Sequence, residues 1–306
     1  MAIVAILVAL AGCGTPRSNS AGVFRPMAAS GIKYVGIFAS NLLSSYAPAL
    51  SFSQATGAQV SIAGYYSGWP EPFQTGFAET AWKHGATTLV DMDPHNGAAT
   101  ITAVADGRYD AYLRSFAKAV AGFGHPVIVS FAHEMNGSWY QYGYKYVSPA
   151  VFVAAYRRVH DVFSAAGARN VIWMWAVNRP VPGQTSPSVA EWYPGDAYVD
   201  WVGVDGYDWS GSLTFTQAFA ATLAQVRSFT NRPVLIAETS VLPGANAAAQ
   251  VTSWFQGIVS DHLLGLVWFD IDKASRKGIA DDHDWKLEND PPALAAFQAA
   301  IREYGP

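Results

Sequence analysis

This sequence has a single cysteine, few charged side chains and no excess of positive charge. Each of these shortages excludes a class of protein. One cysteine stands among the 306 residues, so no disulfide can form within the chain. The chain has 19 lysines and arginines against 23 aspartates and glutamates, so it has no excess of positive charge with which to bind phosphates. We therefore expect no nucleic-acid partner. Charged residues are 14% of the chain and hydrophobic residues 51%, a composition that excludes general disorder and predicts a large core.

Aromatic side chains, by contrast, are abundant. Phe, Trp and Tyr make up 14% of the residues, with 11 Trp and 15 Tyr. This is more than a core needs, because a buried Trp N–H or Tyr hydroxyl must also find a hydrogen-bond partner. Surfaces that stack against sugar rings are one use for such residues. The length fits a single α/β barrel, a fold that commonly takes about 250 residues.

The first 13 residues predict export and a lipid anchor. Met1–Ala11 is an almost purely apolar run, too short to span a bilayer but of the length of a signal-peptide core. It leads into Leu-Ala-Gly-Cys at residues 10–13, which resembles the bacterial lipobox, whose cysteine becomes lipidated. We expect lipidation at Cys13 and a protein held at the cell surface; the alternative is an ordinary cleaved signal and a secreted protein. Residues 14–31, rich in Ser, Pro, Gly and Ala, predict a flexible tether.

Residues 32–305 predict one α/β domain. Short β-branched or aromatic runs alternate there with longer amphipathic stretches, as in repeated βα units. The expected strands are Lys33–Ala39, Val60–Tyr65, Thr87–Asp91, Pro126–Ala132, Asn170–Ala176, Asp200–Val204, Pro233–Ala237 and Leu264–Phe269. Eight such units predict a single (β/α)8 TIM barrel. A doubly wound open sheet is the alternative, but no Gly-rich phosphate loop follows the first strand.

Polar residues stand where these strands end. The ends carry Asp91 and Asp93, His133 and Glu134, Asn178, Asp205 and Tyr207, Glu238, and Asp270. Because catalytic groups of such barrels lie beyond the carboxyl ends of the strands, we expect all of them to converge on one face. A coincidence of many polar groups at one kind of position indicates a site more strongly than any one of them does.

Two of these residues fit the hydrolysis of a glycosidic bond. That reaction needs one carboxylic acid to protonate the leaving oxygen and a second carboxylate across the anomeric carbon. Glu134 and Glu238 would follow the fourth and seventh strands, on opposite sides of the barrel mouth. Other glutamates, such as Glu191, Glu288 and Glu303, stand in loop or terminal helical contexts and are predicted to be surface charges.

The residues around the first glutamate carry a resemblance. The run His-Glu-Met-Asn-Gly-Ser-Trp at 133–139 resembles the acid/base signature of glycoside hydrolase family 26, retaining (β/α)8 enzymes that include β-mannanases. Further matching motifs, in the family's order, are Tyr-Pro-Gly-Asp at 193–196, residues 199–207, Ile-Ala-Glu-Thr at 236–239, Trp268-Phe269 and Asp284-Trp285. The resemblance spans nearly all of the chain after the tether.

The resemblance implies roles for individual residues. It makes Glu134 the acid/base, Glu238 the nucleophile, His133 a contact to sugar or catalytic oxygens and Tyr207 a hydrogen-bond partner of the nucleophile. It also suggests Trp139 and Trp268 as subsite walls. From their positions after strands, Trp69 and Asn178 are added as candidates for substrate binding, although either side chain could instead belong to the core. The expected activity is that of a retaining endo-β-glycanase, with no cofactor, working as a monomer.

The substrate is less determined than the mechanism. Mannanases of the family carry an Arg-Pro pair shortly before the His-Glu, whereas this sequence has Ser130-Phe131. We therefore expect β-1,4-mannan to be the first substrate without being uniquely preferred, with mixed-linkage β-glucan and β-1,3-xylan as alternatives. Transglycosylation shares the same covalent intermediate and stays open. A non-catalytic carbohydrate-binding lipoprotein is the third class, but a binder has no use for two converging acids.

Metal binding is not predicted. Asp91, Asp93 and His95 form one polar cluster, and residues 281–284, Asp-Asp-His-Asp, form another. Neither has the spacing of a calcium loop or of a zinc-binding helix. Hydrolysis by two carboxylates also needs no metal. We therefore expect these residues to be ordinary polar side chains of loops.

Overall fold

A computed structural model describes residues 31–94, 101–181, 187–273 and 283–306. The predicted signal and tether, with Cys13, lie outside these ranges, as do His95, Asp281 and Asp282. Within the described ranges no helix is both long and apolar enough to cross a membrane.

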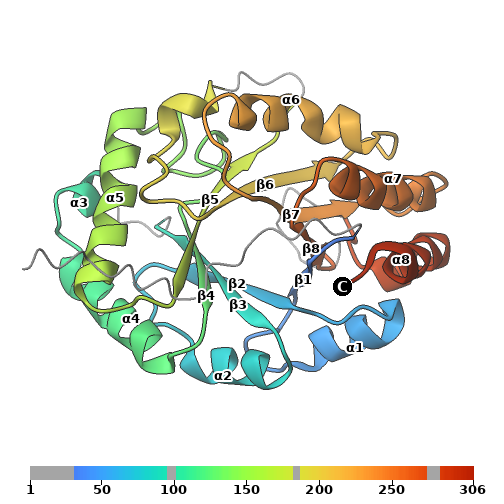
Figure 1. Ribbon diagram of the computed structural model, residues 1–306, viewed down its shortest axis with the longest axis horizontal. Helices are drawn as coiled ribbons and strands as arrows, with labels where there is room; N and C mark the ends of the chain where they lie inside the picture. Colours follow the sequence, from blue (N-terminus) through green and yellow to red (C-terminus); the bar gives the residue numbers. More distant parts are fainter. Residues whose placement is uncertain (1–30, 95–100, 182–186, 274–282) are drawn as a thin grey trace, which may run out of the picture.

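The strands form a closed barrel in which each strand runs parallel to its neighbours. In chain order they are β1 (Tyr34–Ala39), β2 (Ile62–Gly68), β3 (Thr87–Asp93), β4 (Val127–Phe131), β5 (Val171–Asn178), β6 (Trp201–Asp208), β7 (Val234–Val241) and β8 (Gly265–Asp270). β1 pairs with β8 along its whole length, which closes the sheet (Figure 1). The prediction of a single (β/α)8 barrel is confirmed.

Helices surround the barrel on its outside (Figure 1). They are α1 (Ala47–Thr56), α2 (Thr75–Lys83), α3 (Ile101–Ala105), α4 (Asp110–Phe123), α5 (Pro149–Ala165), α6 (Phe215–Arg227), α7 (Ala247–Ser260) and α8 (Pro291–Tyr304), with short 3₁₀ turns η1 (Val189–Trp192) and η2 (Leu287–Asn289). The helix α8 packs against α7 and α1, so the two ends of the described chain meet on one side of the barrel.

Local sequence explains where several helices begin. Thr214 and Gln217 form a reciprocal capping box at the start of α6. The Asp290 side chain accepts the Ala293 N–H at the start of α8, and Pro291 occupies the first helical position. Helix α4 ends at Gly124, whose φ of 76° is the left-handed conformation that glycine adopts without strain.

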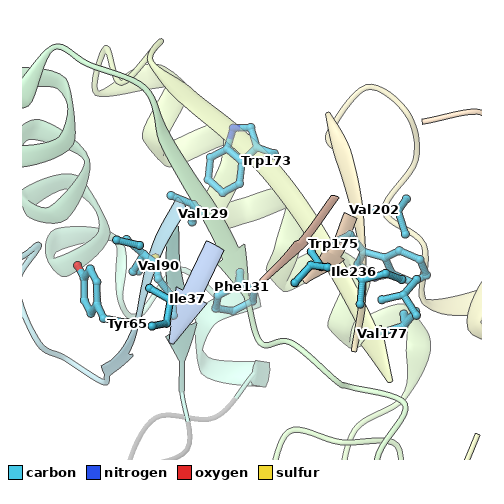
Figure 2. Close-up of a cluster of buried hydrophobic side chains, with 14 of the residues drawn as sticks. Ile37, Tyr65, Val90, Val129, Phe131, Trp173, Trp175, Val177, Val202 and Ile236 are labelled. Atoms are coloured by element: carbon cyan, nitrogen blue, oxygen red, sulfur yellow. The ribbon is translucent and has the colours of Figure 1, made fainter. Parts of the chain in front are cut away.

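Two layers of apolar side chains make the core. Alternate strand residues such as Phe38, Leu89 and Ile128 fill the barrel interior. Their neighbours, including Ile37, Val90, Val129 and Trp175, point outward and pack under the helices (Figure 2). Since both faces of each strand are buried, the strands are near-continuous apolar runs, and the sequence alone does not show which residues face inward.

Six strands extend further than the sequence predicts. β2, β3 and β8 continue to Gly68, Asp93 and Asp270, and β5, β6 and β7 continue to Asn178, Asp208 and Val241, one to four residues beyond the expected ends. Many of the added residues are polar but buried, and β5, β6 and β7 continue the ladder through the register pairs Asn178–Asp205 and Asp205–Glu238. The polar residues at this end of the barrel are therefore held by strand hydrogen bonds.

Candidate active site

The backbone at Glu134 is unusual. β4 ends at Phe131, and the chain then turns over the barrel mouth with Glu134 in the left-handed region, at a φ of 53°. A non-glycine residue in such a conformation costs on the order of 1–3 kcal/mol and persists only when its surroundings impose it. Here the Glu134 N–H donates to the Ala176 carbonyl at 3.0 Å, and the Glu134 carbonyl accepts the Gly137 N–H at 2.8 Å.

Two donors hold the Glu134 carboxyl. The Trp139 indole N–H donates to Oε2 at 2.6 Å, and the Asn178 side-chain amide donates to Oε1. Asn178 is itself held by Asn136: the Asn136 amide donates to the Asn178 carbonyl at 2.7 Å, and the Asn178 N–H donates to Asn136 Oδ1 at 2.9 Å. The loop after β4 and the end of β5 thus fix the carboxyl together.

Burial changes the ionisation of Glu134. The residue is only 6% exposed, and this burial raises the pKa of its carboxyl to about 7, with the charge of Glu238 acting in the same direction. The charge of His133 and the hydrogen bonds from Asn178 and Trp139 oppose that rise in pKa. Glu134 is therefore poised to give and take a proton near neutral pH.

The surroundings of Glu238 differ. Glu238 lies within β7, 8% exposed, and each of its carboxyl oxygens accepts a hydrogen bond from a tyrosine hydroxyl, Tyr66 from β2 and Tyr207 from β6. Burial and the charge of Glu238 raise the pKa of both tyrosines well above its usual value. Both therefore remain protonated donors to the carboxylate. Sequence reasoning identified Tyr207 but missed Tyr66.

His133 is the centre of a buried network beside Glu134. Its Nδ1 lies 2.8 Å from Asp93 Oδ1, and its Nε2 lies 3.1 Å from the Tyr140 hydroxyl. Tyr142 also donates to Asp93 Oδ1, at 3.1 Å. Burial alone would lower the pKa of His133, but Asp93 and Asp91 outweigh it and raise that pKa well above the usual value. The surrounding aspartates thus favour the protonated form of the imidazole beside Glu134.

Two further carboxyls lie inside the barrel. Asp205 is in register with Asn178 on one side and Glu238 on the other. Burial, then the charges of Glu134 and Glu238, raise the pKa of Asp205 well above its usual value. Burial likewise raises the pKa of Asp91 to about 7. The site thus concentrates acids whose pKa values are raised.

Tyr207 is supported by aromatic rings that sequence reasoning did not assign. The Trp285 ring lies 5.1 Å from the Tyr207 ring, and Phe269 meets it edge-on at 5.5 Å. Trp209, 47% exposed, packs against Trp285 with ring centroids 5.1 Å apart. The motif at 284–285 marked Trp285 as part of a pattern, but only the fold places its ring beside the Tyr207 hydroxyl donor.

The structure places the predicted binding aromatics in different layers. Trp139 is 43% exposed while its N–H contacts Glu134, so its ring lies at the surface beside this carboxyl. Trp268 is 1% exposed and packs outward against Phe297 of α8, at 5.4 Å, so it belongs to the outer core and does not form a subsite wall. Trp69 is likewise buried, against Tyr112 at 4.7 Å. Trp268 lies on the outer face of β8 under α8, and Trp69 packs against α4, so both side chains belong to the core.

A cavity of about 930 Å³ opens beside Glu238. Its lining includes Glu238, Tyr66 and Tyr140, the loop residues 40–44 after β1, and Lys273 after β8. Glu134 does not line it, so the cavity lies on the Glu238 side of the pair. Its volume is at the upper end of that of small-molecule pockets, which leaves room for more than one sugar ring.

The polar clusters considered for metals are otherwise engaged. Asp93 binds His133, and Asp284 accepts the Lys286 N–H at 3.0 Å and the Asn289 amide at 2.6 Å. Across the described ranges, no three His, Cys, Asp or Glu residues gather as metal ligands. His95, Asp281 and Asp282 lie outside those ranges.

The geometry combines an acid that titrates near neutral pH with a carboxylate held by two neutral donors. Such a pair can protonate one oxygen while a second group attacks or stabilises the adjacent carbon. The cavity lies beside Glu238, and the exposed Trp139 ring lies beside Glu134.

Comparisons with known proteins agree with this chemistry. The model of glycosyl hydrolase family 26 matches residues 84–257, more than half of the chain. Endoglucanase H of Acetivibrio thermocellus is 28% identical over 267 residues, covering 82% of this chain and 28% of that protein. A mannan endo-1,4-β-mannosidase of Bifidobacterium adolescentis is 29% identical over 101 residues, covering 33% of this chain and 10% of its own length.

The fold is also found among solved structures. A Cellulomonas fimi endo-β-1,4-mannanase double mutant matches with a TM-score of 0.67 at 20% sequence identity, covering 88% of this chain and 70% of that one. At this identity the likeness concerns the fold. The chain spans less than a third of the length of either curated relative.

Proposed function

The chain belongs to glycosyl hydrolase family 26, and we propose that it hydrolyses the backbone of a β-linked polysaccharide with retention of configuration. Glu134 is the acid/base and Glu238 the nucleophile. The observation that carries the proposal is the contrast between the two carboxyls: burial raises the pKa of Glu134 to about 7, whereas two tyrosine hydroxyls stabilise the charge of Glu238.

In the first step Glu134 gives its proton to the glycosidic oxygen while a Glu238 oxygen attacks the anomeric carbon. The carbon–oxygen bond to the leaving sugar breaks as the ester to Glu238 forms. The negative charge on Glu238 disappears in this step, and with it one cause of the raised pKa of Glu134. The Glu134 carboxylate then takes a proton from water, whose oxygen attacks the anomeric carbon and releases Glu238.

The cavity supports a polymeric substrate. Glu134 must face the leaving group, so the cavity on the Glu238 side receives the glycone. Lys273 and loop residues such as Asn41 offer donors beyond the first sugar position, and Lys273 Nζ lies 4.6 Å over the Phe269 ring. The exposed Trp139 ring continues the site on the leaving-group side. A site that extends both ways favours cleavage within a chain.

β-1,4-Mannan is the first substrate to test, and β-glucan is the second. Mannan follows from the family signature at 133–139 and from the similarity to a mannan endo-1,4-β-mannosidase. β-Glucan is favoured by the much longer similarity to Endoglucanase H, over 82% of this chain. Ser130 and Phe131 also stand where mannanases of the family carry Arg-Pro.

A polysaccharide panel tests the proposal. Purified protein is incubated with β-1,4-mannan, mixed-linkage β-glucan and β-1,3-xylan, and the products are sized over time while NMR follows the anomer first formed. We expect oligosaccharides of several lengths, released first as β-anomers. Inverted product would replace the double displacement by a single one. Absence of turnover on all three polymers contradicts the glycanase assignment.

An added acceptor sugar distinguishes transglycosylation from hydrolysis, because both reactions proceed through the same glycosyl-enzyme intermediate. In a transglycosylase, an added oligosaccharide becomes attached to the glycone, whereas in a hydrolase it leaves the products unchanged. Binding of polysaccharide without any bond cleavage would instead indicate a carbohydrate-binding protein. We propose hydrolysis because both carboxyls and their donors are in place.

We also propose that the protein is exported and anchored by lipid at Cys13, on the sequence at residues 10–13. Two or more acyl chains on one cysteine would hold it far more firmly than a single chain. In a bacterial host the protein should fractionate with membranes, and Cys13→Ser should release or mislocalise it. A mature protein that starts elsewhere by mass spectrometry and carries no lipid contradicts the anchor.

A further inference from the structure

Arg179 is a buried cation that the mechanism above does not use. It follows Asn178 directly and is 7% exposed. Burial lowers the pKa of its guanidinium, an effect that the charge of Asp208 partly offsets. Burying a guanidinium is unfavourable unless its donors are satisfied, so its contacts should reveal what it does.

The guanidinium makes its two shortest hydrogen bonds to one carbonyl. Arg179 Nε and Nη2 both donate to the Tyr207 carbonyl oxygen, at 3.0 and 2.6 Å. The Arg179 N–H donates to the Asp205 carbonyl at 2.9 Å. Gly206 allows this close approach, because a Cβ there would lie 2.9 Å from Arg179 Cδ.

The ladder between β5 and β6 explains why a side chain is needed. Its register ends at the pair Asn178–Asp205, whereas β6 continues to Asp208. The Arg179 guanidinium takes the Tyr207 carbonyl just beyond the point where backbone pairing with β5 stops. It therefore fixes the peptide plane at Tyr207, the residue whose hydroxyl donates to Glu238.

We propose that Arg179 is a positioning residue that holds Tyr207 against Glu238, so that the consecutive residues Asn178 and Arg179 set the donors of both catalytic carboxyls. Asn178 acts on Glu134 directly, through its side-chain amide. Arg179 acts on Glu238 through Tyr207. The inference rests on the proposed function, because it assigns Arg179 to the nucleophile's half of that reaction.

The first test does not depend on activity. A crystal structure of Arg179→Gln should show the Tyr207 hydroxyl displaced from Glu238, because one amide cannot replace two parallel guanidinium donors. A structure in which the Tyr207–Glu238 hydrogen bond is unchanged overturns the proposal. This measurement stays decisive even if wild-type protein cleaves no glycoside, an outcome that would reject only the proposed function.

The second test is kinetic and uses aryl β-glycosides of the sugar that the wild-type protein cleaves. Arg179→Gln should lower kcat/KM roughly tenfold, about what loss of one hydrogen bond to a charged group produces. Its loss should be similar for good and poor leaving groups, since both need the nucleophile. Asn178→Ala is the matched contrast, and its loss should be larger for poor leaving groups, which need the proton of Glu134.

A double-mutant cycle separates positioning from simple stabilisation. If Arg179 acts through the Tyr207 hydroxyl, Arg179→Gln should change kcat/KM less than threefold in a Tyr207→Phe background. An undiminished tenfold loss there, or a lower Tm with unchanged kinetics in the single variant, overturns the proposal. If Arg179→Gln fails to fold, the same crystal structure and double-mutant cycle are carried out with Arg179→Lys. Lysine keeps the positive charge but has a single ammonium donor group, so this variant should show an intermediate loss of kcat/KM.

Discussion

The two catalytic carboxyls stand in unlike surroundings. Glu134 is borne by a loop in a left-handed backbone conformation and is held by an amide and an indole. Glu238 is borne by the strand β7, where the register with β6 and β8 shifts, and is held by two tyrosines. The difference matches the tasks proposed for them, in which Glu134 exchanges a proton twice in each cycle and Glu238 remains a charged nucleophile until it forms a bond.

The loss of Glu238 should give the largest effect. Glu238→Ala removes the attacking atom, for which no neighbouring group substitutes, and should lower kcat on every substrate by on the order of 10⁵-fold. Activity is measured on polysaccharide and on an aryl glycoside with a good leaving group. A variant that retains much of its activity on the aryl glycoside would show that the strand-borne carboxyl is not the nucleophile.

The loss of Glu134 should depend on the leaving group. Glu134→Ala should lower turnover of polysaccharide by about 10²–10⁴-fold, the usual contribution of acid/base catalysis. An aryl glycoside whose leaving group needs no proton should be affected much less, with glycosyl-enzyme accumulating. Azide should restore turnover and give a β-glycosyl azide. Equal losses on both substrates would break the contrast between the two carboxyls.

Removing a hydrogen-bond donor of Glu134 should change the pH profile, whereas removing a donor of Glu238 should not. The basic limb of kcat/KM reports the proton of Glu134 and should fall near pH 7, because burial raises the pKa of this group to about 7. Trp139→Phe removes a hydrogen bond that lowers this pKa, so the limb should move to higher pH. Tyr66→Phe, on the Glu238 side, should lower kcat/KM roughly tenfold with little movement of that limb. A matching shift in both variants contradicts separate surroundings.

The smallest expected effect is on stability. Burial raises the pKa of Glu134 in the folded state from 4.5 to about 7, so the folded chain binds this proton more tightly than the unfolded chain. The free energy of unfolding therefore falls as pH rises through that window. Glu134→Gln lacks this loss and should gain on the order of 3 kcal/mol over wild type between pH 4.5 and pH 8. Tm measured across that range checks it, and a pH-independent difference excludes the effect.

Much of this molecule follows from its sequence. Eight apolar runs predicted the barrel, and Glu134 and Glu238 stood out because each follows such a run directly. Several strand ends were misjudged because residues near them, such as Asn178 and Glu238, are polar yet buried. An apolar run shows where a strand passes through the core, while only three-dimensional convergence shows which polar residues prolong it.

The sequence alone did not show which face of the sheet each side chain occupies. Trp268 points outward toward α8 and Phe269 points into the barrel, although the run that contains them is apolar on both faces. Similarly, Tyr65 packs outward and Tyr66 inward to Glu238. In a strand buried on both sides, neighbouring aromatics are interchangeable until the register is known. The tyrosine pair within β2 was the available signal for a residue at the site.

The left-handed backbone at Glu134 also has a consequence for folding stability. Position 134 combines a conformation that favours glycine with a buried acid, so two physical terms make the native residue unfavourable for folding. Glycine there would relax the backbone and remove the buried acid in one substitution. On these two terms alone, folding stability favours glycine over glutamate at this position.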